Sequence, residues 1–241
     1  MGNTFLIDKN KAIFLAQCCK LAYNQFKQDG VFLVPEGYEL VKSFKAKVFS
    51  KNEWFGYIMQ SSDDSILVFR GTDSDIDWVA DAIFYQVPYP YVFGQGKVHG
   101  GFLSIYDSCR EEIIETLKTI DPAKKLYITG HSLGGALSTL CTLDLTQAFP
   151  QKDIILYNYA SPRVGDSDFM NLFYQNNPNA IRFVNHFDLV PHLPPATIYN
   201  IINKKTYNYR HIFSPYYFAA PALSVEGNHS IDTYIAAMEK L

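Results

Sequence analysis

The sequence predicts an α/β fold in which helices cover both faces of a mostly parallel β-sheet. From residue 125 onward, short apolar runs alternate with segments of helical periodicity, in the order strand, helix, strand, helix, strand. Such alternation is typical of right-handed βαβ units, whose strands lie parallel. The run IILYNYA at 154–160 is almost continuously apolar, as expected for a strand buried on both faces. No linker, repeat or charge block interrupts the chain, so we expect one domain over residues 1–241.

The composition of the 241 residues is that of an ordinary globular protein. Hydrophobic residues make up 48% and charged residues 19%, so the chain can bury a sizeable core. The formal net charge of −3 gives no argument for nucleic acid or for an anionic membrane as a partner. The aromatic content of 15% is explained more readily by core packing than by a binding surface. Four cysteines, all in segments with helical periodicity, are expected to be buried free thiols: Cys18, Cys19, Cys109 and Cys141.

No targeting or membrane segment is visible in the sequence. The N-terminal residues lack the basic and apolar regions of a signal peptide, and no apolar run approaches the length of a membrane span. We therefore expect a cytoplasmic protein by default, or a secreted one if a signal has been removed from this chain. No Cys and His spacing resembles a zinc site, so no metal is expected.

The first part of the chain is predicted to form one helix and three strands. An apolar stripe within 9–28 follows helical spacing, and Asp8 is placed to cap that helix. Strands are expected at 38–49, 54–60 and 65–70, the last two as a hairpin.

Later segments are predicted with the same reasoning. The stretch 84–98, rich in Pro, Gly, Tyr and Phe, is expected to be a long loop, and a second helical stripe follows over 102–120. The Tyr-rich segment 206–213 is expected to add a last strand, and the apolar segment 213–221 is expected to be a loop. The chain closes with a helix that begins near Ile231.

The strongest chemical signal is the run KLYITGHSLGGA at 125–136. It contains Gly-x-Ser-x-Gly between a short strand and a helix, which places Ser132 on a sharp, strained turn that exposes its hydroxyl. The small residues around it remove side-chain bulk that such a junction cannot hold. The helix begins near Leu133, and its free N–H groups and dipole favour a developing oxyanion. This arrangement is typical of a nucleophilic serine.

A serine nucleophile needs a base, which a third group orients. Among the later acids only Asp188 follows directly on a buried-looking strand, at 181–187, and catalytic groups of open α/β sheets lie at the carboxyl ends of strands. His229 lies in a predicted loop before the terminal helix and completes the chain order Ser, Asp, His. His186, two residues from Asp188, is the rival base, and spacing alone does not choose between the two histidines.

An oxyanion hole needs two preorganised donors. The backbone N–H of Leu133 is one candidate. The second is expected from a loop after an inner strand, and Gly71-Thr72 fits this position, with the Thr72 hydroxyl as a further donor. An ordinary Gly-Thr turn at the end of a strand explains the same two residues equally well.

Several motifs together resemble the class 3 (fungal-type) lipase family of the α/β-hydrolases. They cover roughly residues 40–240, in the order of the family. The motifs are VFRGT at 68–72, DW at 77–78, VHGGF at 98–102, GHSLGGAL at 130–137, SPRVG at 161–165, DLVP at 188–191 and His229. Ser161 stands where the family usually has glycine, a difference that we expect to be harmless.

The resemblance implies an α/β-hydrolase with an assigned role for each candidate residue. Ser132 is then the nucleophile, Asp188 the acid and His229 the base, while Thr72 and Leu133 supply the oxyanion donors. In this way the resemblance decides between the two candidate histidines, which spacing could not do.

The resemblance also implies a helical lid around residues 73–87, which include Trp78. The expected function is hydrolysis of carboxylic esters of lipids through an acyl-enzyme, with no metal or organic cofactor. The expected partner is a lipid or other ester, met in part at a lipid–water interface, and not nucleic acid. The alternatives are a soluble-ester hydrolase such as a feruloyl esterase, a phospholipase A1, and an inactive hydrolase scaffold used for binding.

Overall fold

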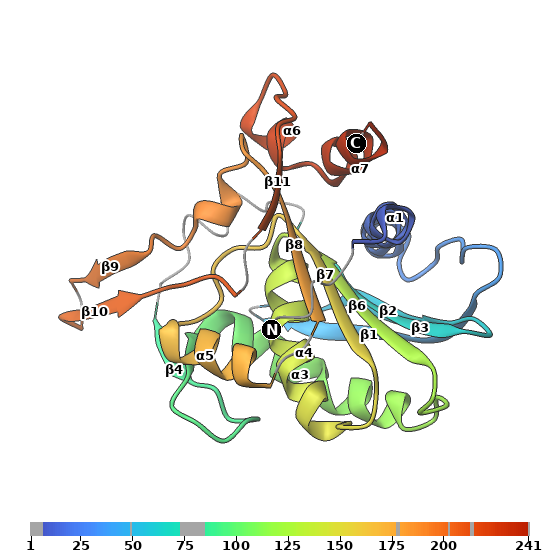
Figure 1. Cartoon of the computed structure of the whole chain (residues 1–241), viewed down its shortest axis with the longest axis horizontal. Coiled ribbons are helices and arrows are strands. Elements are labelled where there is room, and N and C mark those ends of the chain that lie inside the picture. The colour runs from blue at the N-terminus through green and yellow to red at the C-terminus, as the bar shows by residue number, and fades with distance from the viewer. Residues whose placement is uncertain are drawn as a thin grey trace.

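The computed structural model describes residues 7–48, 50–72, 85–176, 179–201, 203–212 and 215–240. Its main sheet contains β1 (Glu39–Val48), β2 (Lys51–Gln60), β3 (Asp64–Phe69), β6 (Lys125–His131), β7 (Ile154–Tyr159), β8 (Asn179–Asn185) and β11 (Pro215–Phe218). These strands lie in the order β1-β2-β3-β6-β7-β8-β11 (Figure 1). The pairs β1–β2 and β2–β3 are antiparallel, and every pair from β3 onward is parallel. The predicted α/β fold with a mostly parallel sheet is therefore confirmed.

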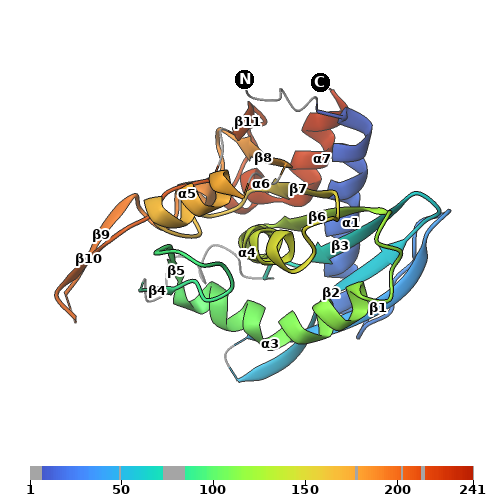
Figure 2. The same ribbon diagram turned by 60° about the horizontal axis from the view of Figure 1, so that its bottom comes forward.

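Helices cover both faces of this sheet (Figure 2). They are α1 (Lys9–Lys27), α3 (Gly100–Leu117), α4 (Leu133–Ala148), α5 (Ser167–Gln175), α6 (Val225–His229) and α7 (Ile231–Glu239), with a short 3₁₀ turn, η1 (Val190–His192). In β3 every residue is buried. Leu67 and Phe69 join the core beneath α3 and α4, whereas Ile66 and Val68 join the core beneath α1 and α7. The alternation of strand side chains thus supplies both cores from one apolar run.

Two helices begin at aspartate caps, and the first of these, Asp8, is the cap that the sequence predicts. Asp8 caps α1 by accepting a hydrogen bond from the Lys11 N–H at 3.0 Å. Asp166 caps α5 in the same way, with the Phe169 N–H at 2.9 Å. In each case the carboxylate satisfies an N–H group that has no partner inside the helix.

The expectations for the region before α6 were wrong. The segment 206–213 does not add a strand to the main sheet, because β10 (Lys205–Asn208) pairs with β9 (Thr197–Asn200) in a separate two-stranded sheet. The last strand of the main sheet is instead β11, inside the segment 213–221 that was expected to be a loop. Proline at the first position of β11 is compatible with an edge strand. In the sequence, however, a proline argues against a strand, so β11 was not predicted.

The stretch 84–98 is not a plain loop either. It contains β4 (Gln86–Pro88) and β5 (Lys97–His99), which pair antiparallel. Strands of three residues are too short for alternation to reveal them. Similarly, β2 begins at Lys51, earlier than predicted, because Lys51 pairs with Val48 across the turn from β1.

The predicted lid lies mostly outside the described residues. Of the segment 73–87, the structure describes only Tyr85 and the first two residues of β4, Gln86 and Val87. Within the described ranges, no helix has the length and apolar character needed to cross a membrane.

All four cysteines are buried and free, as predicted. Cys18 and Cys19 lie in α1, Cys109 in α3 and Cys141 in α4. Burial raises the pKa of the Cys19 thiol to about 12, so this thiol stays protonated. The cysteines therefore act as small apolar side chains of the two cores.

Candidate active site

Ser132 lies at the junction of β6 and α4, with φ 57° and ψ −124°. A positive φ is uncommon for a residue with a side chain and marks local strain. The two segments also pass very close to one another. A Cβ added to Gly130 would lie 2.1 Å from the Gly134 oxygen, and one added to Gly134 would lie 2.3 Å from the Phe69 oxygen. Only glycine fits at these two positions, and they hold the strained turn in place.

The backbone of Ser132 is well bonded, but its side chain is not. Its N–H donates to the Tyr159 oxygen at 3.0 Å, and its carbonyl accepts from the Gly135 N–H at 2.9 Å. The side chain is fully buried, and its Oγ has no hydrogen-bond partner among the described residues. Leaving a buried hydroxyl unbonded is unfavourable, so such a group calls for a functional explanation.

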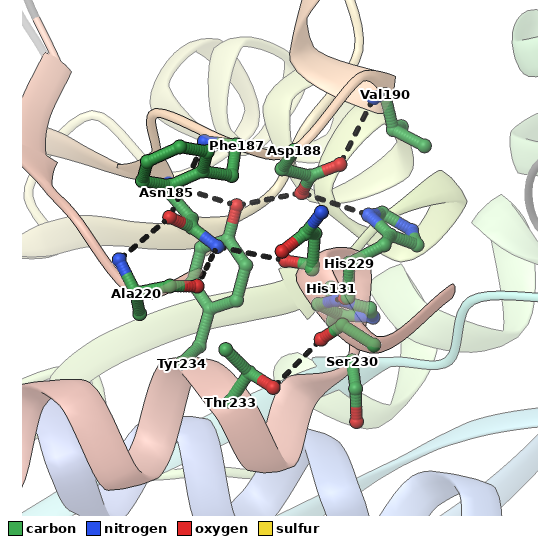
Figure 3. Close-up of polar contacts among 12 residues, drawn as sticks. His131, Asn185, Phe187, Asp188, Val190, Ala220, His229, Ser230, Thr233 and Tyr234 are labelled. Carbon is green, nitrogen blue, oxygen red and sulfur yellow. Dashed lines mark hydrogen bonds and ion pairs between the residues drawn. The ribbon is translucent and has the colours of Figure 1, made fainter. Parts of the chain in front are cut away.

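Asp188 and His229 form a buried pair (Figure 3). Nδ1 of His229 lies 2.8 Å from Oδ2 of Asp188. Because the carboxylate accepts, Nδ1 carries the proton, and Nε2 of the neutral ring then holds a lone pair. An imidazole held in this tautomer by a buried carboxylate is equipped to act as a general base.

Two further donors bind the Asp188 carboxylate. The Tyr234 hydroxyl, from α7, donates to Oδ2 at 2.7 Å, and the Val190 N–H donates to Oδ1 at 3.0 Å (Figure 3). Together with His229 they compensate for the loss of water around a buried carboxylate. Burial and then the charge of Asp188 raise the pKa of Tyr234 well above its usual range, so its hydroxyl stays protonated and donates.

Asn185, the last residue of β8, joins the two parts of the chain that carry Asp188 and His229. Its Nδ2 donates to the Ala220 oxygen at 2.9 Å and to the Asn228 oxygen at 3.0 Å, while its Oδ1 accepts from the Ala220 N–H at 3.0 Å. Asn185 precedes Asp188 by three positions, and Asn228 is next to His229. One buried amide therefore fixes both chain segments relative to each other (Figure 3).

His131 connects the pair to the serine turn. Its Nε2 lies 2.7 Å from the His229 oxygen, and its Nδ1 lies 2.8 Å from the Tyr23 hydroxyl. A carbonyl only accepts, so Nε2 donates, and Nδ1 of the neutral ring accepts from Tyr23. The rings of His131 and His229 are 4.7 Å apart between centroids. His229 is thus held against the residue that precedes Ser132.

The two predicted oxyanion donors come from segments that meet at the same turn. Leu133 is the first residue of α4, where the N–H groups have no carbonyl partner inside the helix. Gly71 allows the chain after β3 to pack closely against the turn that carries Ser132, because a Cβ on Gly71 would lie 2.9 Å from the His131 oxygen. Thr72 follows directly and is buried.

The other histidines near the site have different partners. His186 is exposed and lies just beyond β8, where its ring stacks on Tyr217 at 4.6 Å and 10°. His99 caps α3, its Nδ1 accepting from the N–H groups of Gly101 and Phe102. Burial lowers the pKa of His99 to about 4, so this ring is neutral at pH 7.

Three polar residues of this site were missed from the sequence: Tyr23, Asn185 and Tyr234. Their partners here lie 35 to 108 positions away along the chain, so local spacing carries no sign of them. The one available signal was Asn185, a polar residue that ends an apolar strand. The placement of His229 in a loop was also wrong, because it is the last residue of α6. A helix of five residues is too short to show periodicity.

The parallel sheet, the strained serine between β6 and α4, and the Asp–His pair beyond β8 define an α/β-hydrolase. The sequence model of the family described as lipase (class 3) matches residues 66–198. The chain belongs to this class 3 lipase family.

Named relatives agree with this assignment. The chain is 38% identical over 170 residues to a lipase of Rhizomucor miehei, covering 67% of this chain and 46% of that protein. It is 28% identical over 210 residues to phospholipase A1-II 6 of Oryza sativa subsp. japonica, covering 69% and 51%. A solved structure described as a triacylglycerol lipase whose catalytic centre is a serine protease triad has a TM-score of 0.71 at 30% identity, covering 86% and 79%. The chain spans about half the length of these two curated relatives.

Proposed function

We propose that this chain hydrolyses carboxylic esters of lipids through an acyl-enzyme on Ser132. The observation that carries the proposal is the buried pair of Asp188 and His229, 2.8 Å apart, bonded through His131 to the turn that holds the serine. Similarity to proteins named as lipases supports lipid esters as the substrate class.

In the first half of the reaction, Oγ of Ser132 attacks the ester carbonyl carbon while Nε2 of His229 takes its proton. Asp188 holds the imidazole in place and stabilises the cation that forms. The Leu133 N–H and Thr72 receive the oxyanion, and each such donor contributes about a hundredfold or more in rate. His229 then protonates the departing alkoxide, the ester C–O bond breaks, and the acyl group stays on Ser132.

In the second half, water attacks the acyl-enzyme with His229 again as base, and the carboxylic acid leaves. Water is the only co-reactant in this sequence. The mechanism requires the Ser132 side chain to turn toward His229, because its Oγ makes no bond to any described residue. Catalytic hydrogen bonds often tighten only when substrate binds.

The test is a panel of p-nitrophenyl esters of increasing chain length together with emulsified triolein, measured on wild type and on Ser132→Ala. We expect the variant to lose about 10⁴-fold or more in kcat on every ester, since removal of a nucleophile leaves only binding and oxyanion stabilisation. Retained turnover would refute the assignment of Ser132.

The choice of base is tested with His229→Ala and His186→Ala. We expect only the first to abolish turnover, because the Asp188 carboxylate bonds to His229, whereas the ring of His186 stacks on Tyr217. The opposite result would exchange their roles.

A phospholipase A1 activity is the second candidate, supported by the similarity to the rice phospholipase A1-II 6 over 69% of this chain. Release of fatty acid from phosphatidylcholine, compared with release from triolein, decides between the two substrates. A preference for short soluble esters, with no rise in rate at an interface, would favour an esterase over both.

A further inference from the structure

The strands β9 and β10 form an arm that stands away from the rest of the molecule in both views (Figures 1 and 2). Among the strands that the structure describes they pair only with each other, and none of their residues is fully buried. A two-stranded ribbon without a core beneath it is marginally stable in water. Packing in a core therefore does not explain this arm, so a role is expected at its surface.

The tip of the arm combines apolar and positively charged side chains. Ile201 is 81% exposed and Tyr199 is 58% exposed. Lys204 follows in the turn and Lys205 begins β10, and both are exposed. An exposed aliphatic and aromatic pair beside two lysines has the composition of a segment that lies at a lipid interface.

The charge of the surrounding chain is equally one-sided. No Asp or Glu occurs between Asp188 and Glu226, although the whole chain has a formal net charge of −3. The same segment contains Lys204, Lys205 and Arg210. Although the whole chain is negatively charged, this segment is positively charged and can attract anions.

The base of the arm is fixed to the body of the protein. Gln86 Nε2 donates to the Asn208 oxygen at 2.7 Å, and the Tyr209 hydroxyl donates to the Tyr85 oxygen at 3.2 Å. These bonds hold β10 beside the start of β4. The arm therefore keeps a set position relative to the sheet that carries the site.

Exposed apolar side chains concentrate in the same part of the chain. More than half of the large hydrophobic residues that are exposed in the described ranges fall between positions 187 and 225. Those that flank the acid or precede the base along the chain are Phe187, Leu189, Leu223 and Val225. Water-exposed apolar groups around a site for lipid esters gain free energy when a lipid surface covers them.

We propose that the β9–β10 arm docks the protein on anionic lipid surfaces. Tyr199 and Ile201 enter the interface, and Lys204 and Lys205 meet anionic headgroups. This inference rests on the proposed function, because it assigns to that site a substrate presented in a negatively charged surface.

The test measures binding to vesicles in a Ser132→Ala background, so that no lipid is consumed. Co-sedimentation is compared between vesicles of phosphatidylcholine and vesicles of phosphatidylcholine with phosphatidylglycerol. Neutralising both lysines (Lys204→Gln with Lys205→Gln) is expected to weaken binding to the anionic vesicles on the order of 30-fold, from about 1 kcal/mol for each lysine. Binding to phosphatidylcholine alone should change less than twofold. Ile201→Ser is expected to weaken binding to both.

Matched controls come from elsewhere on the surface. Lys47→Gln with Lys51→Gln removes a lysine pair from the β1–β2 hairpin, and Leu33→Ser removes a side chain that is also highly exposed. Neither control should change vesicle binding more than twofold. Thermal unfolding of each variant verifies that it is folded.

Equal affinity of the parent for the two kinds of vesicle would overturn the proposal, as would equal losses in the arm variants and in the controls. A dimer in solution that dissociates on Ile201→Ser would also overturn it, by making a second copy the occupant of the arm. Failure of the proposed function would show itself separately, as absent ester hydrolysis by the protein with Ser132 intact.

Discussion

The two halves of the site are held in different ways. The serine half is fixed by backbone packed so closely against backbone that glycine alone fits, at Gly130 and Gly134. The acid–base half is fixed by side-chain hydrogen bonds from Asn185, Tyr234 and His131, each reaching far along the chain.

This difference has consequences for how each half responds to change. In the closely packed serine half, a single added methyl group forces the backbone to move, so one substitution disrupts the whole turn. A hydrogen-bond network loses its members one at a time, each at a moderate cost in free energy. Substitutions in the two halves should therefore differ in kind as well as in size.

The largest effect is expected for Gly130→Ala. The new Cβ would lie 2.1 Å from the Gly134 oxygen, so either α4 or β6 must move. We expect the free energy of unfolding to fall by more than about 4 kcal/mol, enough to prevent folding of a marginally stable domain. Yield of soluble protein and urea denaturation measure this.

Gly101→Ala is the control for that substitution. A Cβ there would meet only the side chain of His99, at 3.0 Å, within the first turn of a helix. Folding of Gly101→Ala with little loss is expected, and equal losses for the two variants would remove the steric basis of the comparison.

An intermediate effect is expected from His99, a histidine outside both halves. Its pKa in the folded protein, about 4, lies below the ordinary value of 6.5, so the unfolded chain binds more protons between these pH values. The stability that His99 contributes is present above pH 6.5 and is lost as the pH falls to 4. At about 1.4 kcal/mol per pKa unit, the loss amounts to about 3 kcal/mol.

Urea denaturation of wild type and His99→Asn at several pH values measures this loss. Asparagine can still cap α3 but does not titrate, so the variant should show a flatter dependence on pH in this range. Parallel curves would contradict the prediction.

The smallest effect is expected for Tyr234→Phe. The ring stays in its core position, and Asp188 keeps its bonds to His229 and Val190. The variant loses the hydrogen bond to the Asp188 carboxylate and also the acceptor of the Asn185 N–H, which lies 3.1 Å from the Tyr234 oxygen. We expect kcat to fall about tenfold and its pH profile to shift.

Tyr57→Phe separates this effect from a general loss of stability. Tyr57 is also fully buried, and its hydroxyl donates to the Cys18 oxygen at 2.9 Å and not to Asp188. We expect it to lose a similar amount of stability with unchanged kcat. A fall in kcat of the same size would show that Tyr234 acts only through stability.

The serine half could be predicted because its causes are local. The turn, the small residues and the start of α4 lie within the run at 125–136, and the helical and strand periodicities beside it are long enough to read. The same holds for the cap Asp8, whose partner is three residues away.

The acid–base half could be predicted only as single residues. Asp188 stands out by its place after a strand, and the family resemblance selects His229 over His186. The network that joins the two residues depends on how β8, α6 and α7 come together. The short elements α6 and β11 were not predicted for a related reason, because neither is long enough to show a helical or strand periodicity.

Asn185 has a consequence for how this protein can vary. By bonding to Ala220 and Asn228, it closes a ring of chain that begins three residues before Asp188 and ends just before His229. The free energy of closing a loop changes only slowly with its length, so residues inserted into a ring that is already clamped leave its ends in place. The β9–β10 arm grows from this ring. Insertions into this segment are therefore compatible with an unchanged geometry of Asp188 and His229.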